Sequence, residues 1–141
     1  MQRPEVKFNL IIDQPVKFVN DSFRVSIILD NLISNAVKYQ KPYSDEPMVN
    51  ISVKTDGYKA QIEIEDNGIG IVEEHLNNIF KMFFRSTSHV NGLGIGLYIV
   101  KEALSRIGGD ISVVSTYSVG TIFRIMIPNL SKEQIASDIV N

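Results

Sequence analysis

Two kinds of apolar periodicity follow one another along this chain, and their order limits the folds that it can adopt. Apolar residues alternate with polar ones in five segments, as in half-buried strands, and recur every three or four residues in three others, as in amphipathic helices. Strands are predicted at 6–10, 49–53, 60–64, 111–115 and 121–127, and helices at 23–39, 73–80 and 96–107. Short turns join the second strand to the third and the fourth to the fifth, which indicates two hairpins.

Hairpins combined with long helices favour an α/β two-layer sandwich of the α+β kind. We expect a mixed, mostly antiparallel sheet of about five strands, covered on one face by about three helices, and not a doubly wound parallel sheet. The chain has 141 residues, which fits one domain. We expect residues 1–128 to form it and residues 129–141 to be a frayed helical or disordered tail.

Charge and cysteine content narrow the classes of function. The net charge of −2 argues against a nucleic-acid-binding protein, which would carry a basic face. The chain has no cysteine, so disulfides and thiolate metal sites are excluded. Its longest apolar run, at 97–100, is far too short to span a membrane. We therefore expect a cytoplasmic domain without direct membrane contact.

Three alternating glycines, Gly92, Gly94 and Gly96, lead without a break into the helix predicted at 96–107. Glycine permits positive φ and the close approach of another group. The helix that follows would present unpaired N–H groups and the positive end of its dipole, which suits phosphate. Glycine-rich turns before helices are common, so the pattern alone leaves phosphate binding open.

Asn31, Asn35 and Lys38 share one face of the helix predicted at 23–39, because they are four and three residues apart. Two amides and an ammonium group on one stripe could coordinate hydrated Mg²⁺ and hold phosphate oxygens. A solvated helix face has a similar composition. Asparagine is a mediocre helix former, however, and the opposite face is apolar, which favours a site on this face.

Asp66 follows the third predicted strand and opens a loop of sequence Asp-Asn-Gly-Ile-Gly that ends at Gly70. A carboxylate in this position can accept a hydrogen bond from an exocyclic amine such as adenine N6. Gly70 would let the base lie close to the backbone. The same residues are ideal for a plain turn, so both interpretations stay open.

An aromatic cluster of Phe80, Phe83 and Phe84 precedes a polar segment, and its simplest interpretation is core packing. Arg85, directly after it, could neutralise charge on a transferred phosphoryl group. We expect the two histidines, His75 and His89, to be surface residues, because no metal-ligand cluster accompanies them.

Five segments resemble, in family order, the motifs of sensor histidine kinases. They are the N box at 31–39, the G1 box at 66–70, the F box at 79–85, the G2 box at 92–97 and the closing G3 element at 120–123. The resemblance implies the catalytic ATP-binding domain of a bacterial two-component kinase. It also implies the Bergerat fold, which this domain shares with gyrase B, MutL and the large heat-shock chaperones.

The resemblance implies ATP and Mg²⁺ as cofactors, and roles for the matching residues. On the phosphate side, Asn35 would bind Mg²⁺ with Asn31 assisting, and Lys38 and Arg85 would contact phosphate. The residues with catalytic roles would be Asn35, Lys38 and Arg85.

On the base side, Asp66 would accept the adenine amine, Thr121 would approach the base through a shared water, and Tyr39 would flank the ring. Gly68 and Gly70 would shape the pocket. The other nucleotide contacts implied by the resemblance are Ile71, Phe83, Gly92, Leu93, Gly94, Gly96 and Leu97.

One position separates the kinases from their ATP-hydrolysing relatives. The relatives carry a water-activating glutamate one helical turn before the Mg²⁺ asparagine, where this chain has Asn31. Asp30 is adjacent but lies about 100° around the helix. The resemblance therefore implies transfer of phosphoryl to a protein histidine, and argues against an anti-sigma-factor serine kinase.

The implied partners are the chain's own helical dimerisation and phosphoacceptor domain, expected upstream of Met1, and the receiver domain of a response regulator. We expect the fragment to be a monomer and the parent a homodimer; whether the parent is membrane-anchored stays open. A catalytically silent nucleotide-binding signalling module of the same fold is the alternative. A dinucleotide-binding Rossmann domain is disfavoured, because its glycine loop should directly follow a strand.

Overall fold

The computed structural model describes residues 4–86 and 94–130. Its elements, in chain order, are β1 (Lys7–Asp13), α1 (Ser22–Lys38), β2 (Met48–Thr55), β3 (Lys59–Asp66), the 3₁₀ turn η1 (Glu73–His75), α2 (Gly96–Arg106), β4 (Asp110–Thr116) and β5 (Gly120–Pro128).

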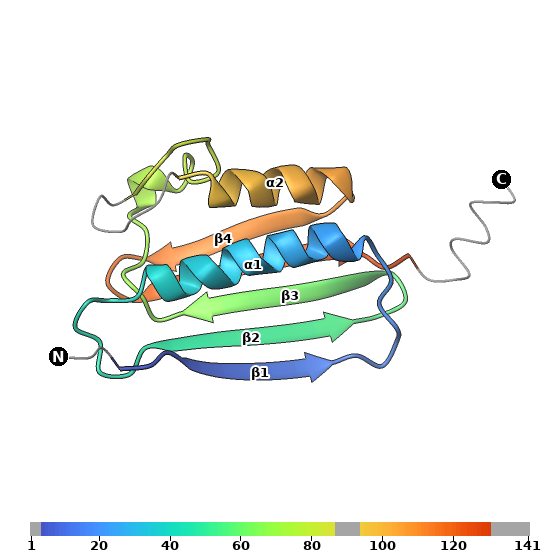
Figure 1. The fold of residues 1–141 in the computed structure, drawn as a ribbon, viewed down its shortest axis with the longest axis horizontal. Helices are drawn as coiled ribbons and strands as arrows, with labels where there is room; N and C mark the ends of the chain where they lie inside the picture. Colours follow the sequence, from blue (N-terminus) through green and yellow to red (C-terminus); the bar gives the residue numbers. More distant parts are fainter. Residues whose placement is uncertain (1–3, 87–93, 131–141) are drawn as a thin grey trace, which may run out of the picture.

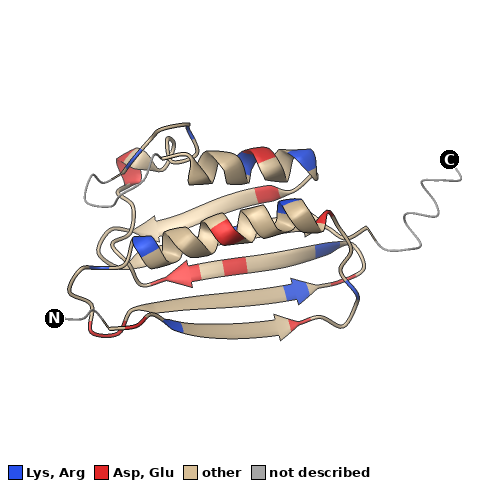
Figure 2. Cartoon of the chain, viewed as in Figure 1, with Lys and Arg blue, Asp and Glu red and all other residues tan. Residues whose placement is uncertain are grey.

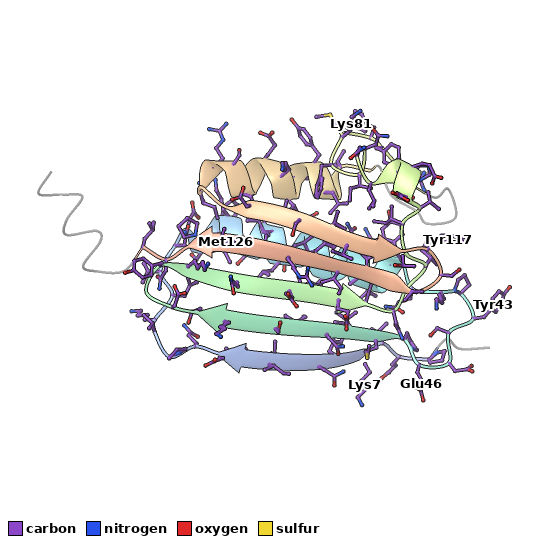
Figure 3. The ribbon with its side chains drawn as sticks, turned by 180° about the vertical axis from the view of Figure 1, so that it is seen from behind. Lys7, Tyr43, Glu46, Lys81, Tyr117 and Met126 are labelled. Carbon is purple, nitrogen blue, oxygen red and sulfur yellow. The ribbon has the colours of Figure 1, made fainter. Side chains whose placement is uncertain are left out.

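The five strands form one mixed sheet in the order β1-β2-β3-β5-β4. β1 pairs with β2 in parallel, and the other neighbours are antiparallel. α1 and α2 lie together on one face of the sheet (Figure 1). No described helix covers the opposite face, from which Met126 projects (Figure 3). The predicted two-layer architecture and both hairpins are confirmed.

The core lies between the sheet and the two helices. α1 starts at the N-cap Asp21, whose side chain accepts a hydrogen bond from the Arg24 N–H. Each helix turns a stripe at helical spacing toward the sheet, and these residues meet alternate residues of the inner strands. The fully or nearly buried core residues, which include Ile79 from the turns after η1, are Ile28, Leu32, Ala36, Val49, Ile62, Ile64, Ile79, Val100, Ala103, Leu104, Phe123, Ile125 and Ile127.

The segment predicted as a short helix at 73–80 contains only η1, followed by turns. Val72 occupies the N-cap position and offers no side chain to cap the first turn. A helix this short gains few hydrogen bonds for the cost of starting it, so it stays a turn. The sheet is therefore covered by two α-helices and this 3₁₀ turn.

β1 departs from the half-buried strand that its alternation predicts. Its inward-facing residues Phe8, Leu10 and Ile12 are 51%, 61% and 56% exposed. β1 is an edge strand, and α1 packs over β2 and β3. The apolar face of β1 therefore extends beyond the helical layer.

The folded body also extends past residue 128. Asn129 is fully buried, and the Leu130 N–H donates to the Val19 carbonyl at 2.8 Å. The tail predicted at 129–141 begins with these two residues, and its remainder, residues 131–141, lies outside the described part of the chain. Within the described part, neither helix has the length and apolar content that crossing a membrane requires.

Candidate nucleotide site

A cavity of about 280 Å³ opens where the C-terminal end of α1, the N-terminus of α2 and the end of β3 meet. Figure 2 shows the blue last turn of α1 at the same end of the domain as the red end of β3. The described residues that line the cavity are Asn31, Ser34, Asn35, Lys38, Tyr39, Asp66, Ile69, Gly70, Ile71, Ile79, Phe84, Ser86, Gly94, Ile95, Gly96, Leu97, Ile99, Thr121 and Phe123.

Asp66 provides the carboxylate at one end of this cavity. It is the last residue of β3, it is 7% exposed, and its Oδ1 accepts the Gly68 N–H at 2.9 Å. Burial raises the pKa of the Asp66 carboxyl to about 6, although the backbone N–H groups of Gly68 and Thr121 oppose the rise. A buried carboxylate with one oxygen engaged by backbone has remaining lone pairs to accept a ligand amine.

The loop after Asp66 is held between α1 and the β4–β5 turn. The Ile69 N–H donates to the Tyr39 carbonyl at 2.9 Å, and the Ile69 carbonyl accepts the Ser118 N–H at 2.7 Å. Tyr117 in the β4–β5 turn and Tyr43 after α1 lie at this same end of the molecule (Figure 3). The wall of the cavity beside Asp66 is thus built from three separate segments.

Gly70 is required in this loop for two reasons. Its φ is +71°, which side-chain-bearing residues rarely adopt, and a Cβ there would lie 2.1 Å from the Thr116 carbonyl oxygen. The glycine therefore allows the loop to lie directly against the end of β4 and leaves the cavity open in front of it.

Two amide oxygens converge at the other end of the cavity. A Cβ placed on Gly96 would be 3.1 Å from Asn31 Oδ1 and 3.9 Å from Asn35 Oδ1. Asn31 Nδ2 donates to the Ile27 carbonyl at 2.8 Å, so this side chain presents its oxygen to the cavity. Mg²⁺ prefers oxygen ligands and keeps several waters. The pair therefore fits a hydrated divalent cation, and no cluster of three His, Cys, Asp or Glu residues in the described chain offers an alternative.

The N-terminus of α2 faces the same space. Ile95 is its N-cap and provides no side-chain hydrogen bond, and Ile95, Gly96 and Leu97 all line the cavity. The unpaired N–H groups of the first turn and the helix dipole therefore favour an anion here. Lys38, in the last turn of α1, adds a cation to the lining.

Most residues singled out from the sequence meet in this cavity. Those lining it are Asn31, Asn35, Lys38, Tyr39, Asp66, Gly70, Ile71, Gly94, Gly96, Leu97 and Thr121. Among the described candidates, Gly68, Phe83 and Arg85 are not part of the lining. The Gly68 N–H donates a hydrogen bond to the Asp66 carboxylate. Phe83 is 65% exposed and has a φ of +65°. Gly92 and Leu93 lie outside the described residues.

Sequence reasoning missed several lining residues, chiefly apolar ones. Ser34 could have been found, because it lies three residues after Asn31 and four before Lys38 on the same helical face. Phe123 follows Thr121 by two residues on the same side of β5. Of the others, Ile69, Ile79, Phe84 and Ile95 lie inside the motifs at 66–70, 79–85 and 92–97 without having been assigned a contact, and Ser86 and Ile99 carry no signal of their own in the sequence.

His75 is half-buried rather than a free surface residue. Its Nδ1 lies 2.8 Å from the hydroxyl of the cavity-lining Ser86, and its ring packs edge-on against Phe84 at 5.4 Å. His75 therefore fixes the chain just before residue 87. His89 lies outside the described residues.

The two ends of the cavity carry different kinds of ligand-binding groups. One end offers acceptors and apolar side chains, which suits a heterocycle with an exocyclic amine. The other offers amide oxygens, an ammonium group and a helix N-terminus, which suits phosphates with a divalent cation.

Comparison with known proteins places this geometry in a family. A model of the family described as "Histidine kinase-, DNA gyrase B-, and HSP90-like ATPase" matches residues 20–131. The sensor protein RprX of Bacteroides fragilis (strain YCH46) is 36% identical over 133 residues, which cover 92% of this chain and 25% of RprX. This chain spans between 12% and 25% of the length of such curated relatives.

Solved structures of known proteins are also similar to this chain. The mycobacterial sensor histidine kinase MprB has a TM-score of 0.74 and 27% identity, over 88% of this chain and 84% of that chain. Full-length ShkA in complex with AMPPNP has a TM-score of 0.74 and 25% identity, over 88% of this chain and 26% of that one. The family model covers most of the chain and the relatives are sensor kinases, so the chain belongs to the histidine kinase-, DNA gyrase B- and HSP90-like ATPases, as an ATP-binding catalytic domain of the sensor histidine kinase type.

Proposed function

We propose that this domain binds ATP with Mg²⁺ in the described cavity and donates the γ-phosphoryl group to a histidine of a helical dimerisation and phosphoacceptor domain. The phosphoryl group would then pass to the receiver domain of a response regulator. In this proposal the adenine lies beside Asp66 and Thr121, and the phosphates lie at the N-terminus of α2.

The composition of the cavity wall is the observation that supports a protein histidine, and not water, as the acceptor of the phosphoryl group. Among the described lining residues, Asp66 is the single carboxylate, and it lies at the base end. The position that faces the phosphates is Asn31, whose amide cannot take a proton from water. Asp30 is exposed and does not line the cavity. This wall therefore supports transfer to an incoming nucleophile over activation of water.

The chemistry that follows is an in-line displacement. The bond between the γ-phosphorus and the β–γ bridging oxygen breaks, a bond to an imidazole nitrogen forms, and ADP leaves. A bound Mg²⁺ supplies charge neutralisation on the phosphates. Asn31 and Asn35 hold oxygens at the cation position, and Lys38 and the α2 N-terminus stabilise phosphate charge. Arg85 follows the aromatic cluster at the cavity edge, and we place it near the γ-phosphate.

Calorimetric titration with ADP and with a non-hydrolysable ATP analogue, each with and without Mg²⁺, tests the binding step. We expect binding that weakens without Mg²⁺ and that GDP does not reproduce. Transfer is tested by adding the phosphoacceptor domain of the parent kinase and labelled ATP. Binding without transfer would favour the silent signalling module, and no binding at millimolar nucleotide would refute the proposal.

A further inference from the structure

The hydroxyl of Ser115, on β4, joins three parts of the base end of the cavity without lining the cavity itself. Its Oγ lies 2.8 Å from the Ile71 nitrogen, 3.0 Å from the Gly120 carbonyl oxygen and 2.7 Å from Thr121 Oγ1. Ser115 and Thr121 are direct cross-strand partners of β4 and β5. Ile71 and Thr121 both line the cavity.

One arrangement of protons satisfies all three contacts. A serine hydroxyl has one proton to donate and two lone pairs that accept. The Ile71 N–H can only donate and the Gly120 carbonyl can only accept, whereas either Ser115 or Thr121 could be the donor between the two hydroxyls. All three contacts are hydrogen bonds at once when Ser115 donates to Gly120 and Thr121 donates to Ser115.

The direction of the Thr121 proton decides what the cavity offers to a base. Thr121 is 5% exposed, and with its proton directed at Ser115 its oxygen can only accept on the cavity side. Asp66 faces Thr121 across β3 and β5, and as a carboxylate it also only accepts. Both polar side chains that face each other across β3 and β5 at the base end are then acceptors.

We infer that Ser115 is a positioning residue for base selectivity, which orients the Thr121 hydroxyl so that the site takes 6-amino purines and rejects 6-oxo purines. The inference rests on the proposed ATP-binding function. A 6-amino group donates to acceptors, directly or through one water, whereas a 6-oxo group with a protonated N1 presents an acceptor to the carboxylate. Without Ser115 the Thr121 hydroxyl is free to rotate and to donate into the cavity.

The experiment compares ADP with IDP, which differ in the 6-substituent and in protonation of N1. Calorimetry gives the ratio of their affinities for the unsubstituted chain, Ser115→Ala, Ser115→Thr and Thr121→Val. We expect Ser115→Ala to lower the ADP-to-IDP affinity ratio about tenfold, the size of one hydrogen bond lost from discrimination. Ser115→Thr keeps a hydroxyl and should retain most of the ratio. Ser112→Ala is the matched control, because Ser112 is an exposed serine on the other face of β4.

A merely structural role for Ser115 would weaken ADP and IDP equally, and an unchanged ratio would therefore overturn the inference. Thr121→Val should lower the ratio by itself, and adding Ser115→Ala to it should change the ratio no further. If Ser115→Ala folds poorly, Thr121→Val alone still tests the inference, because an unchanged ratio in that variant would overturn it. Additive effects in the double variant would also overturn the inference. Failure of the unsubstituted chain to bind ADP would instead refute the proposed function, and this inference with it.

Discussion

Asp66 can accept a ligand amine when ionised and loses that capacity when protonated. Its pKa is raised to about 6 because the carboxyl is buried at the end of β3. Burial thus brings a group that ordinarily titrates well below neutrality close to the range in which cells operate. The other polar side chains at the cation position are uncharged amides, so between about pH 5 and 8 we expect both ADP binding and stability to respond to pH through Asp66.

Affinity for ADP should fall as the pH drops through about 6, because protonation turns an Asp66 acceptor into a donor. Bound adenine itself favours the ionised form, which moves the midpoint somewhat lower. Calorimetric titrations from about pH 8 to about pH 5 would measure this. Asp66→Asn should lack the transition, and a flat profile in the unsubstituted chain would contradict the assignment.

The free energy of unfolding should rise as the pH drops, which is opposite to the change in ADP affinity. A folded-state pKa above the unfolded value of 3.8 means that the stabilising contribution of Asp66 is fully present below pH 3.8 and is lost as the pH rises through about 6. Asp66→Asn should therefore raise the free energy of unfolding at pH 8 by about 1–2 kcal/mol while it weakens ADP at least about tenfold. Urea denaturation measures the first effect. Asp30→Asn, an exposed site on α1, should change neither quantity.

Asn35 should be needed for the cation and not for folding. Asn35→Ala removes one of the two amide oxygens near Gly96, so we expect ADP binding to lose its Mg²⁺ dependence and transfer to a supplied acceptor domain to fall at least about a hundredfold. The melting temperature should stay within about 3 °C, because Asn35 lies outside the buried core. Asp30→Ala is the matched control on the same helix. Normal transfer by Asn35→Ala would refute the assigned role.

At the scale of the elements, the loop after β3 is held in place by contacts to three other segments. It donates hydrogen bonds to the end of α1 and to β4, accepts one from the β4–β5 turn, and packs closely against the end of β4 at Gly70. α2 contributes the backbone N–H groups of its first turn, because no side chain caps its N-terminus, which faces the cavity. One wall of the site is thus held by packing, and the opposite wall offers unsatisfied backbone donors to a ligand.

Gly70→Ala should destabilise the domain by about 2–4 kcal/mol, because it combines a positive φ with a Cβ 2.1 Å from the Thr116 carbonyl oxygen. Gly57→Ala is the matched control, since a Cβ there meets nothing within 4 Å, and it should change stability by less than about 0.5 kcal/mol. Thermal or urea unfolding distinguishes the two. Equal stability of both variants would mean that the loop relaxes freely, and the close packing against β4 would lose its importance.

At the scale of the whole molecule, the side chain of Asn129 links three segments at the end of the sheet opposite the cavity. Its Oδ1 accepts the Val19 N–H at 2.9 Å, and its Nδ2 donates to the carbonyls of Lys17 and Asp56 at 2.9 and 2.8 Å. The chain after β5, the segment before α1 and the β2–β3 turn are therefore fixed to one another by one buried amide.

Asn129→Ala should lower the free energy of unfolding by about 2–4 kcal/mol, since it leaves buried backbone groups without partners. Affinity for ADP should be unchanged in the folded population, because the site lies at the other end of the sheet. Asn77→Ala, at an exposed asparagine, is the control. A small effect of Asn129→Ala on urea unfolding would show that water replaces these hydrogen bonds readily.

The sequence alone determined the elements, because periodicity, caps and turn residues act over a few neighbouring positions. The helix at 23–39, both hairpins and the helix from Gly96 follow from such local signals, as does the shared face of Asn31, Asn35 and Lys38. The short helix at 73–80 failed because its competition with a turn depends on small differences in local free energy.

Only the tertiary structure decided which of these elements meet. The position of β1 at the sheet edge set its exposure, and the burial of Asp66 set its pKa. The three contacts of Ser115 join β4, β5 and the loop after β3, up to 44 positions apart in the chain. Local sequence patterns carry no information on contacts between residues so far apart in the chain, because burial, hydrogen-bond partners and proton direction arise from packing between distant segments.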